Sequence, residues 1–130
     1  MLLFVVCLSC TLKADEGIPS YTIIENAAWD HILLTGPMKE IAKKADAVCF
    51  GTLAQRSEES RNTIQAFLSL TPPHAYRILD INIRQHYYSE EIIASSLEKS
   101  NVLKMNEEEL KLLKRLFSWV LYNLGELCEL

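Results

Sequence analysis

Residues 76–84 read Y-R-I-L-D-I-N-I-R, and the alternation in this stretch decides which fold the sequence is expected to adopt. Successive side chains of a β-strand point to opposite faces, so every second residue shares a face. One face would be apolar, formed by Leu79, Ile81 and Ile83. The other face would carry three polar side chains towards its carboxyl end, which are Asp80, Asn82 and Arg84. The pattern therefore predicts a strand with one buried face and one polar face.

The polar face of this strand allows two interpretations. Open α/β sheets bind ligands at the carboxyl ends of their strands, so a carboxylate, an amide and a guanidinium there indicate a binding site. The alternative is an amphipathic strand with a solvated face and one surface ion pair. The strand alone does not decide between them.

The segments on both sides alternate between helical and strand patterns. Residues 37–45 begin with a proline and repeat apolar residues at helical spacing, which predicts a short helix. The apolar run A-V-C-F-G-T-L (47–53) predicts a buried strand. Ser57 is expected to cap a helix that runs to about Leu70, where T-P-P ends it.

The same alternation continues to the end of the chain. Ser89 is expected to cap a helix over 90–99, and N-V-L-K (101–104) predicts a short strand. From Glu107 onward, leucines recur at three- and four-residue steps, which predicts a long amphipathic helix. Strands that alternate with helices predict an α/β fold, here a small parallel sheet of three central strands with flanking helices.

The beginning of the chain has a different pattern. A strand from Phe4 to Leu12, a turn at A-D-E-G-I-P and the β-rich Y-T-I-I-E-N together predict a β-hairpin. The apolar opening lacks the positively charged region of a signal peptide and is shorter than the roughly 20 residues that span a bilayer. We therefore divide the chain into a hairpin over 1–29 and an α/β part over 30–130.

Composition and charge exclude several classes of function. A net charge of -4 provides no basic surface for nucleic acid, and no segment indicates a membrane partner. The four cysteines are too few and too scattered for a disulfide scaffold, which favours a reducing, cytoplasmic location. Cys7 and Cys10 form a C-x-x-C without a second pair, and the three histidines have no ligand spacing, so no metal site is expected.

A second polar motif, M-N-E-E-E-L, follows the strand at 101–104. Asn106 and Glu109 have the spacing of a capping box at the start of a helix. The same two side chains at a helix N-terminus could also orient a hydrated magnesium ion beside phosphate oxygens. Capping and phosphate binding are compatible, so both interpretations are kept.

Three segments, in this order and spacing, resemble those of the ribokinase-like (PfkB) carbohydrate kinases, and most closely those of bacterial fructokinase-like members. They are F-G-T-L-A-Q-R (50–56), D-I-N-I-R (80–84) and N-E-E-E (106–109), within a similarity that extends from about Thr11 to Leu116. The resemblance implies a partial ribokinase-like fold whose hairpin belongs to a lid. It also implies ATP and Mg²⁺ as cofactors and phosphoryl transfer to a sugar hydroxyl, with fructose or a related hexose as the substrate.

The resemblance assigns roles to particular residues. Arg84 would approach the acceptor and the transferred phosphoryl group, with Asn82 and Asp80 shaping the sugar site. Asn106 and Glu109 would assist magnesium and phosphate binding without a direct metal ligand. The lid would contribute two further substrate contacts, which are Asn26 and Trp29.

The sequence also departs from the family. It has no counterpart of the family's glycine-rich amino-terminal segment or of its G-A-G-D motif, which supplies the catalytic aspartate. No catalytic residue is therefore assigned, and the isolated chain is expected to be inactive. The alternative is a non-enzymatic remnant or interaction protein that self-associates, as a homodimer or otherwise, through the hairpin or the C-terminal helix. Open sheet edges would favour such association.

Overall fold

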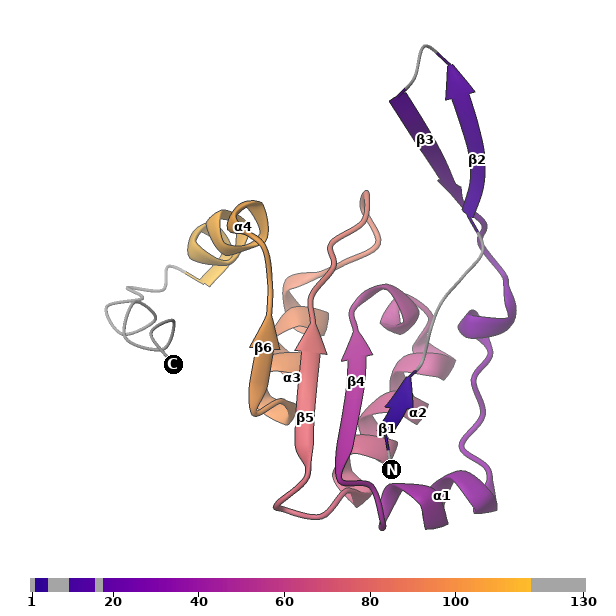
Figure 1. The fold of residues 1–130 in the computed structure, drawn as a ribbon, viewed down its shortest axis with the longest axis vertical. Helices are drawn as coiled ribbons and strands as arrows, with labels where there is room; N and C mark the ends of the chain where they lie inside the picture. The colour runs from indigo at the N-terminus through magenta and orange to yellow at the C-terminus, as the bar shows by residue number, and fades with distance from the viewer. Residues whose placement is uncertain (1, 5–9, 16–17, 118–130) are drawn as a thin grey trace.

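The computed structural model describes residues 2–4, 10–15 and 18–117, and the side chains of residues 23–117. Its main element is a four-stranded sheet in which every neighbouring pair is parallel (Figure 1). The strand order is β1-β4-β5-β6, with bounds Leu2–Phe4, Ala47–Gly51, Tyr76–Asp80 and Val102–Lys104. The predicted α/β class is confirmed. The three expected strands are β4, β5 and β6, and β1 extends the sheet beyond them.

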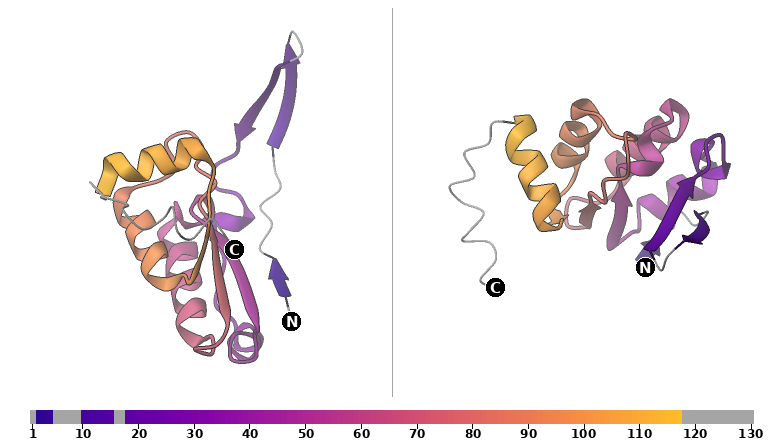
Figure 2. Two further views of the ribbon diagram at one scale, coloured as in Figure 1. Left: turned by 60° about the vertical axis from the view of Figure 1, so that its left-hand side comes forward. Right: turned by 90° about the horizontal axis from the view of Figure 1, so that it is seen from above.

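The helices alternate with these strands as the sequence predicts. α2 (Glu58–Leu70) and α3 (Glu90–Lys99) lie on one face of the sheet, and α1 (Gly36–Ala42) contacts α2 (Figure 2). α4 (Glu107–Phe117) follows β6, and the predicted continuation of this helix lies outside the described residues. Two short 3-10 helices, η1 (Ala28–Asp30) and η2 (Leu53–Gln55), precede α1 and α2.

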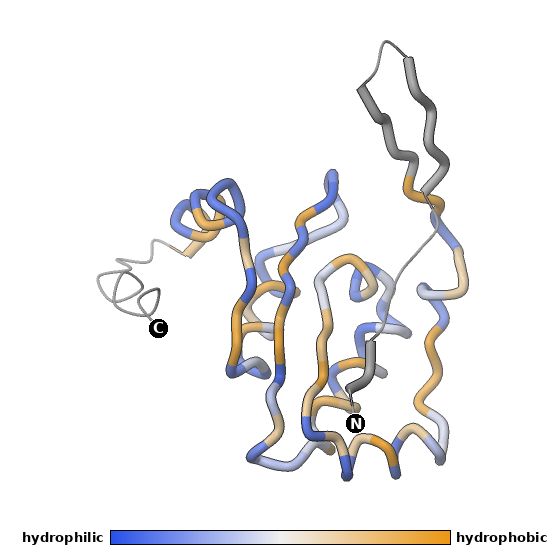
Figure 3. Tube along the Cα trace, in the orientation of Figure 1, coloured by the Kyte–Doolittle hydropathy of each residue, from blue (hydrophilic) through white to orange (hydrophobic). Residues whose placement is uncertain are grey.

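The core lies between the sheet and the helices on that face. Its buried side chains come mainly from β4, β5, α2 and α3, and include Val48, Phe50, Phe67, Leu79 and Ile93. Burying each such side chain stabilises the fold by about 1.5–3 kcal/mol. Figure 3 shows the corresponding apolar colouring along the central strands and mixed colouring in the loops beyond them.

The opposite face of the sheet is not covered by any helix among the described residues (Figure 2). Tyr76 of β5 and Val102 of β6 alternate with the buried Leu79 and the partly buried Leu103, so they belong to this uncovered face. Tyr76 is 63% exposed and Val102 is 38% exposed. The sheet therefore presents apolar side chains to solvent on one side.

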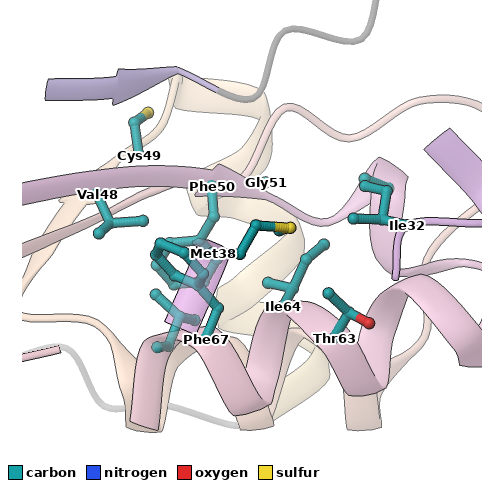
Figure 4. A pocket seen from close by; sticks show the side chains of 11 residues that line it. Ile32, Met38, Val48, Cys49, Phe50, Gly51, Thr63, Ile64 and Phe67 are labelled. Carbon is teal, nitrogen blue, oxygen red and sulfur yellow. The ribbon is translucent and has the colours of Figure 1, made fainter. Parts of the chain in front are cut away.

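A cavity of about 60 Å³ lies between α1, α2 and β4 (Figure 4). Its lining is almost wholly apolar, with Met38, Val48, Phe50, Ile64 and Phe67 among the contacting residues. A space of this kind is a packing feature of the core.

The strand predicted over 76–84 ends earlier than the alternation suggests. β5 stops at Asp80, and the N–H of Ile81 makes one further bond, to the carbonyl of Lys104 at 3.2 Å. Asn82 then takes a left-handed conformation with φ of 45°, which asparagine tolerates better than most residues. The prediction that Asp80, Asn82 and Arg84 share one strand face is therefore wrong, because the backbone turns between them.

The hairpin is also shifted from its predicted position. Its strands are β2 (Cys10–Asp15) and β3 (Ile18–Ile23), which pair antiparallel from Cys10 with Ile23 to Asp15 with Ile18. Leu2–Phe4 pairs instead with the edge of β4, where it meets the open hydrogen-bonding groups of that strand. The predicted strand Phe4–Leu12 is thus corrected, while the domain division at residues 29 and 30 stays a prediction.

Two serines were expected to cap helices, and only one does so. Ser89 accepts a hydrogen bond from the N–H of Ile92 at 3.2 Å, as predicted for α3. Ser57 stands at the N-cap position of α2, but its hydroxyl donates to the carbonyl of Asp30 at 2.5 Å. The hydroxyl of Ser57 therefore binds the end of η1 at Asp30 and does not cap the first turn of α2.

Candidate functional site

Asp80 ends β5 beside Lys104, the last residue of β6. The Nζ of Lys104 donates to the Oδ2 of Asp80 at 2.6 Å, and this bond is the main reason why the pKa of Lys104 is raised. An ion pair therefore exists on this strand, as the second interpretation expected, but the partner is Lys104. The parallel register of β5 and β6 places these two residues opposite each other. The sequence does not show this register, so sequence reasoning did not identify Lys104 as the partner.

Gly51 ends β4 next to the same residue. A Cβ built on Gly51 would lie 2.9 Å from the carbonyl oxygen of Asp80, which is closer than real Cβ contacts. The glycine in F-G-T-L-A-Q-R thus permits the close approach of β4 and β5 at their carboxyl ends.

Arg84 lies in the loop between β5 and α3, residues 81–89, and is exposed. Its Nη1 donates to the carbonyl of Ile83 at 3.2 Å, and no carboxylate among the described residues forms a salt bridge with it. Asn82 is exposed in the same loop. The structure therefore brings Arg84 and Asn82 together in one loop, whereas the carboxylate of Asp80 is engaged by β6.

Asn106 and Glu109 form the predicted capping box at the start of α4. The N–H of Glu109 donates to Oδ1 of Asn106, and the N–H of Asn106 donates to Oε2 of Glu109, both at 2.9 Å. The other carboxylate oxygen of Glu109 accepts the N–H of Ile83, also at 2.9 Å. Glu109 is only 7% exposed, so its carboxylate has a structural role, and its predicted part in magnesium and phosphate binding stays a prediction.

A second polar cluster lies between the segment that follows β3 and Arg56, which precedes α2. Arg56 donates through Nε and Nη2 to the two carboxylate oxygens of Asp30, each at 2.8 Å, and through Nη2 to the carbonyl of Ile24 at 2.7 Å. The side chains of Asp30 and Arg56 are 7% and 9% exposed. These bonds from Arg56 lower the pKa of Asp30, burial opposes them, and the N–H of Ala27 adds to the lowering.

Aromatic rings surround the guanidinium of Arg56. Its Cζ lies 4.5 Å from the ring centroid of Tyr87 and 5.8 Å from that of Trp29, within the range of cation–π attraction. The hydroxyl of Tyr87 donates to Oε1 of Glu25 at 2.7 Å, which raises the pKa of Tyr87. Trp29 Nε1 and Arg56 Nη1 are buried and have no hydrogen-bond partner among the described residues.

Asn26, the other predicted lid contact, lies in the same cluster. It has a φ of 54°, and its Oδ1 is 2.7 Å from Nε2 of His31. The Nδ1 of His31 is in turn 2.8 Å from Oε2 of Glu59 in α2. The structure thus places Asn26 and Trp29 beside Asp30 and Arg56, two residues that sequence reasoning did not assign to a site.

Both residues of the ion pair lie next to residues that the sequence analysis singled out, but the sequence does not show that they form a pair. Arg56 closes the quoted segment F-G-T-L-A-Q-R, and Asp30 directly follows Trp29. Only the fold shows that these two residues, 26 positions apart, form a buried ion pair.

Neither a metal site nor a membrane span appears in the described part of the chain. Within residues 23–117 no three histidine, cysteine or acidic side chains are grouped so that they could hold a metal ion. Of the helices described, none is both long enough and apolar enough to cross a bilayer.

The fold is that of part of a sugar kinase structure. No family model matches the sequence, and no curated protein matches it. Among solved structures, an uncharacterized sugar kinase from Pyrococcus horikoshii matches with a TM-score of 0.69 at 19% identity. The same kinase in complex with ATP matches with a TM-score of 0.68, also at 19% identity. Each match covers 80% of this chain and 36% of the kinase, so the chain spans about a third of that protein's length.

Proposed function

We propose that this chain is a segment of an ATP-dependent sugar kinase, whose parent reaction transfers the γ-phosphoryl group of ATP to a sugar hydroxyl. The observation that carries the proposal is the match in fold to a sugar kinase that has been solved with ATP. The three motif segments support it, because Gly51 and Asp80 are the last residues of β4 and β5, and Asn106 follows the end of β6. Fructose or a related hexose is the proposed substrate.

The proposed contacts differ in how available their side chains are. Arg84 is exposed and is not paired with a carboxylate among the described residues, so its charge is available to a phosphate group. The carboxylate of Glu109 is occupied by two backbone N–H groups and offers no direct ligand to Mg²⁺. The Mg²⁺ of the parent reaction would therefore not be coordinated by Glu109 in this arrangement.

The proposal is tested by calorimetric titration of the chain with ATP and magnesium. We expect weak binding, with a Kd near 1 mM, which corresponds to about 4 kcal/mol. Arg84→Ala should weaken this binding at least about threefold, because a charged hydrogen bond to phosphate is lost. Arg115→Ala, which removes an exposed arginine of α4, is the matched control and should leave the affinity unchanged.

Two results would each contradict one part of this proposal. Equal affinities of Arg84→Ala and the unchanged chain would remove Arg84 from the site. Turnover with ATP, magnesium and fructose at a normal kinase rate, roughly 1–100 per second, would contradict the proposed inactivity of the isolated chain. That inactivity follows from the missing aspartate motif.

A self-associating, non-enzymatic protein is the second candidate. The observation that favours it is the uncovered sheet face with the exposed Tyr76 and Val102. Apolar side chains on an uncovered sheet face are a common feature of interaction surfaces.

A further inference from the structure

We infer that Arg56 and Tyr87 are positioning residues that hold two separate segments in one fixed arrangement. One segment is the hairpin linker, residues 24–31, which carries Asn26 and Trp29. The other is the β5–α3 loop, residues 81–89, which carries Asn82 and Arg84. The inference rests on the proposed function only in treating these four residues as substrate contacts, and its test needs no ligand.

The hairpin linker is fastened to the beginning of α2. Arg56 binds the carboxylate of Asp30 through two donors and also the carbonyl of Ile24, which follows the last residue of β3. Ser60 adds two bonds, since its hydroxyl donates to the carbonyl of Trp29 at 2.6 Å and accepts the N–H of Ile32 at 2.9 Å. The linker is therefore attached at its first residue and near its end.

The β5–α3 loop is fastened independently at its beginning. The N–H of Ile83 donates to the carboxylate of Glu109 in α4, and the carbonyl of Ile81 accepts the hydroxyl of Thr52 at 2.7 Å. Within the loop, the N–H of Tyr87 donates to the carbonyl of Arg84 at 3.1 Å. The backbone position of Arg84 is thus tied directly to that of Tyr87.

The two segments meet at the side chain of Tyr87. Its hydroxyl bonds to Glu25 of the linker at 2.7 Å, and its ring lies 4.5 Å from the guanidinium that holds Asp30 and Ile24. Residues 62 positions apart are joined in this way. A displacement of the linker would therefore act on Tyr87 and, through the backbone bond, on Arg84.

Backbone conformation gives an independent reason to treat the two segments as a unit. Among the described residues, three that are not glycine have a positive φ, and they are Asn26, Asn82 and Gln85. All three lie in the linker or the loop. Conformations of this kind persist where the surrounding contacts fix them, and they cluster where geometry serves function.

Hydrogen exchange of the full chain, followed by mass spectrometry, tests the inference. Tyr87→Phe removes the bond to Glu25 but keeps the ring beside Arg56. We expect exchange to become at least about threefold faster in both segments 24–31 and 81–89, with α3 unchanged. Tyr76→Phe is the matched control, because it removes a tyrosine hydroxyl on the uncovered sheet face, and it should leave both segments as they were.

The result that overturns the inference is equally specific. Faster exchange in the β5–α3 loop alone, or in neither segment, would mean that Tyr87 does not couple them. If Tyr87→Phe lowers protection throughout the chain, Glu25→Gln removes the charge of the same bond from the other side. That variant must then accelerate exchange in residues 81–89 for the inference to stand. The exchange experiment uses no ligand, so its result can be interpreted even if the chain does not bind ATP. The kinase proposal and this inference can therefore fail independently.

Discussion

At the scale of single residues, the ion pair of Asp30 and Arg56 is the most deeply buried one among the described residues. Both side chains are almost completely buried, so neither charge could be left alone without a large desolvation cost. Arg56 uses its planar fork to bind both carboxylate oxygens of Asp30 and, in addition, the carbonyl of Ile24, an arrangement that lysine could not reproduce. Arg56, the last residue of the segment F-G-T-L-A-Q-R, therefore has a structural role.

The buried pair predicts how stability depends on pH. The pKa of Asp30 is lowered from its ordinary value of 3.8, so its carboxylate stabilises the folded chain above that pH. This contribution is lost as the pH falls from about 4 through the lower folded-state pKa. Urea unfolding between pH 3 and pH 7 should show this decline, and Asp30→Asn should flatten it.

The same ion pair also predicts how much stability Asp30→Asn should lose. Asp30→Asn leaves the charge of Arg56 buried without its counter-charge, so the free energy of unfolding at pH 7 should fall by about 3–5 kcal/mol. Glu40→Gln, which breaks an exposed ion pair with Lys43 in α1, is the control and should cost less than about 1 kcal/mol. A pH profile that Asp30→Asn leaves unchanged would contradict the role given to this carboxylate.

Two glycines form a matched pair for a second prediction. Gly51→Ala would place a Cβ 2.9 Å from the backbone oxygen of Asp80, whereas nothing lies within 4 Å of a Cβ at Gly36. Gly51→Ala should therefore lower the free energy of unfolding by about 1–3 kcal/mol, since backbone must move to relieve the contact. Gly36→Ala should be neutral or stabilising, by up to about 1 kcal/mol. Urea denaturation compares the two, and equal effects would count against the close approach of β4 and β5.

At the scale of elements, Glu109 connects the start of α4 to the β5–α3 loop. Its carboxylate closes the capping box of α4 and also holds the N–H of Ile83 at the start of the β5–α3 loop. The sequence predicted the capping box from spacing alone, and the structure confirms it. The bond to Ile83 joins residues 26 positions apart, and no local pattern could indicate it.

This arrangement predicts a difference between neighbouring glutamates of α4. Glu109→Ala leaves two backbone N–H groups without their acceptor, so the free energy of unfolding should fall by about 2–4 kcal/mol. Glu108→Ala removes a side chain that is 81% exposed and should change it by less than about 1 kcal/mol. Circular dichroism during urea unfolding measures both. Similar losses for the two variants would mean that the bonds of Glu109 do not stabilise α4.

At the scale of the whole molecule, the uncovered sheet face and the sheet edges are the features that favour association of copies of the chain. The hairpin of β2 and β3 is separate from the main sheet, and two-stranded hairpins are marginal alone. β6 is the last strand of the sheet on its side, so its outer hydrogen-bonding groups have no neighbouring strand among the described residues. These features support the proposal that copies of the chain associate.

Light scattering coupled to size exclusion at micromolar concentration tests this association. We expect a mass well above the 14.8 kDa of one chain, as a dimer or larger species. Val102→Lys should reduce association if the uncovered face takes part, whereas Lys111→Ala on α4 should have no effect. A clean monomer with cooperative thermal unfolding would exclude self-association and favour a self-sufficient small domain.

The sequence by itself determined the α/β class, the order of strands and helices from α1 to α4, and the capping box of α4. These features depend on contacts between residues near in sequence, such as periodic burial and bonds three positions apart. Only the tertiary structure decided that β5 stops at Asp80, that Lys104 is the ion-pair partner of Asp80, and that Arg56 holds the hairpin linker. Each of these features depends on groups that are distant in sequence and come together only when the sheet forms. A strand ends where its neighbours stop supplying hydrogen bonds, and a buried charge requires a partner of opposite charge.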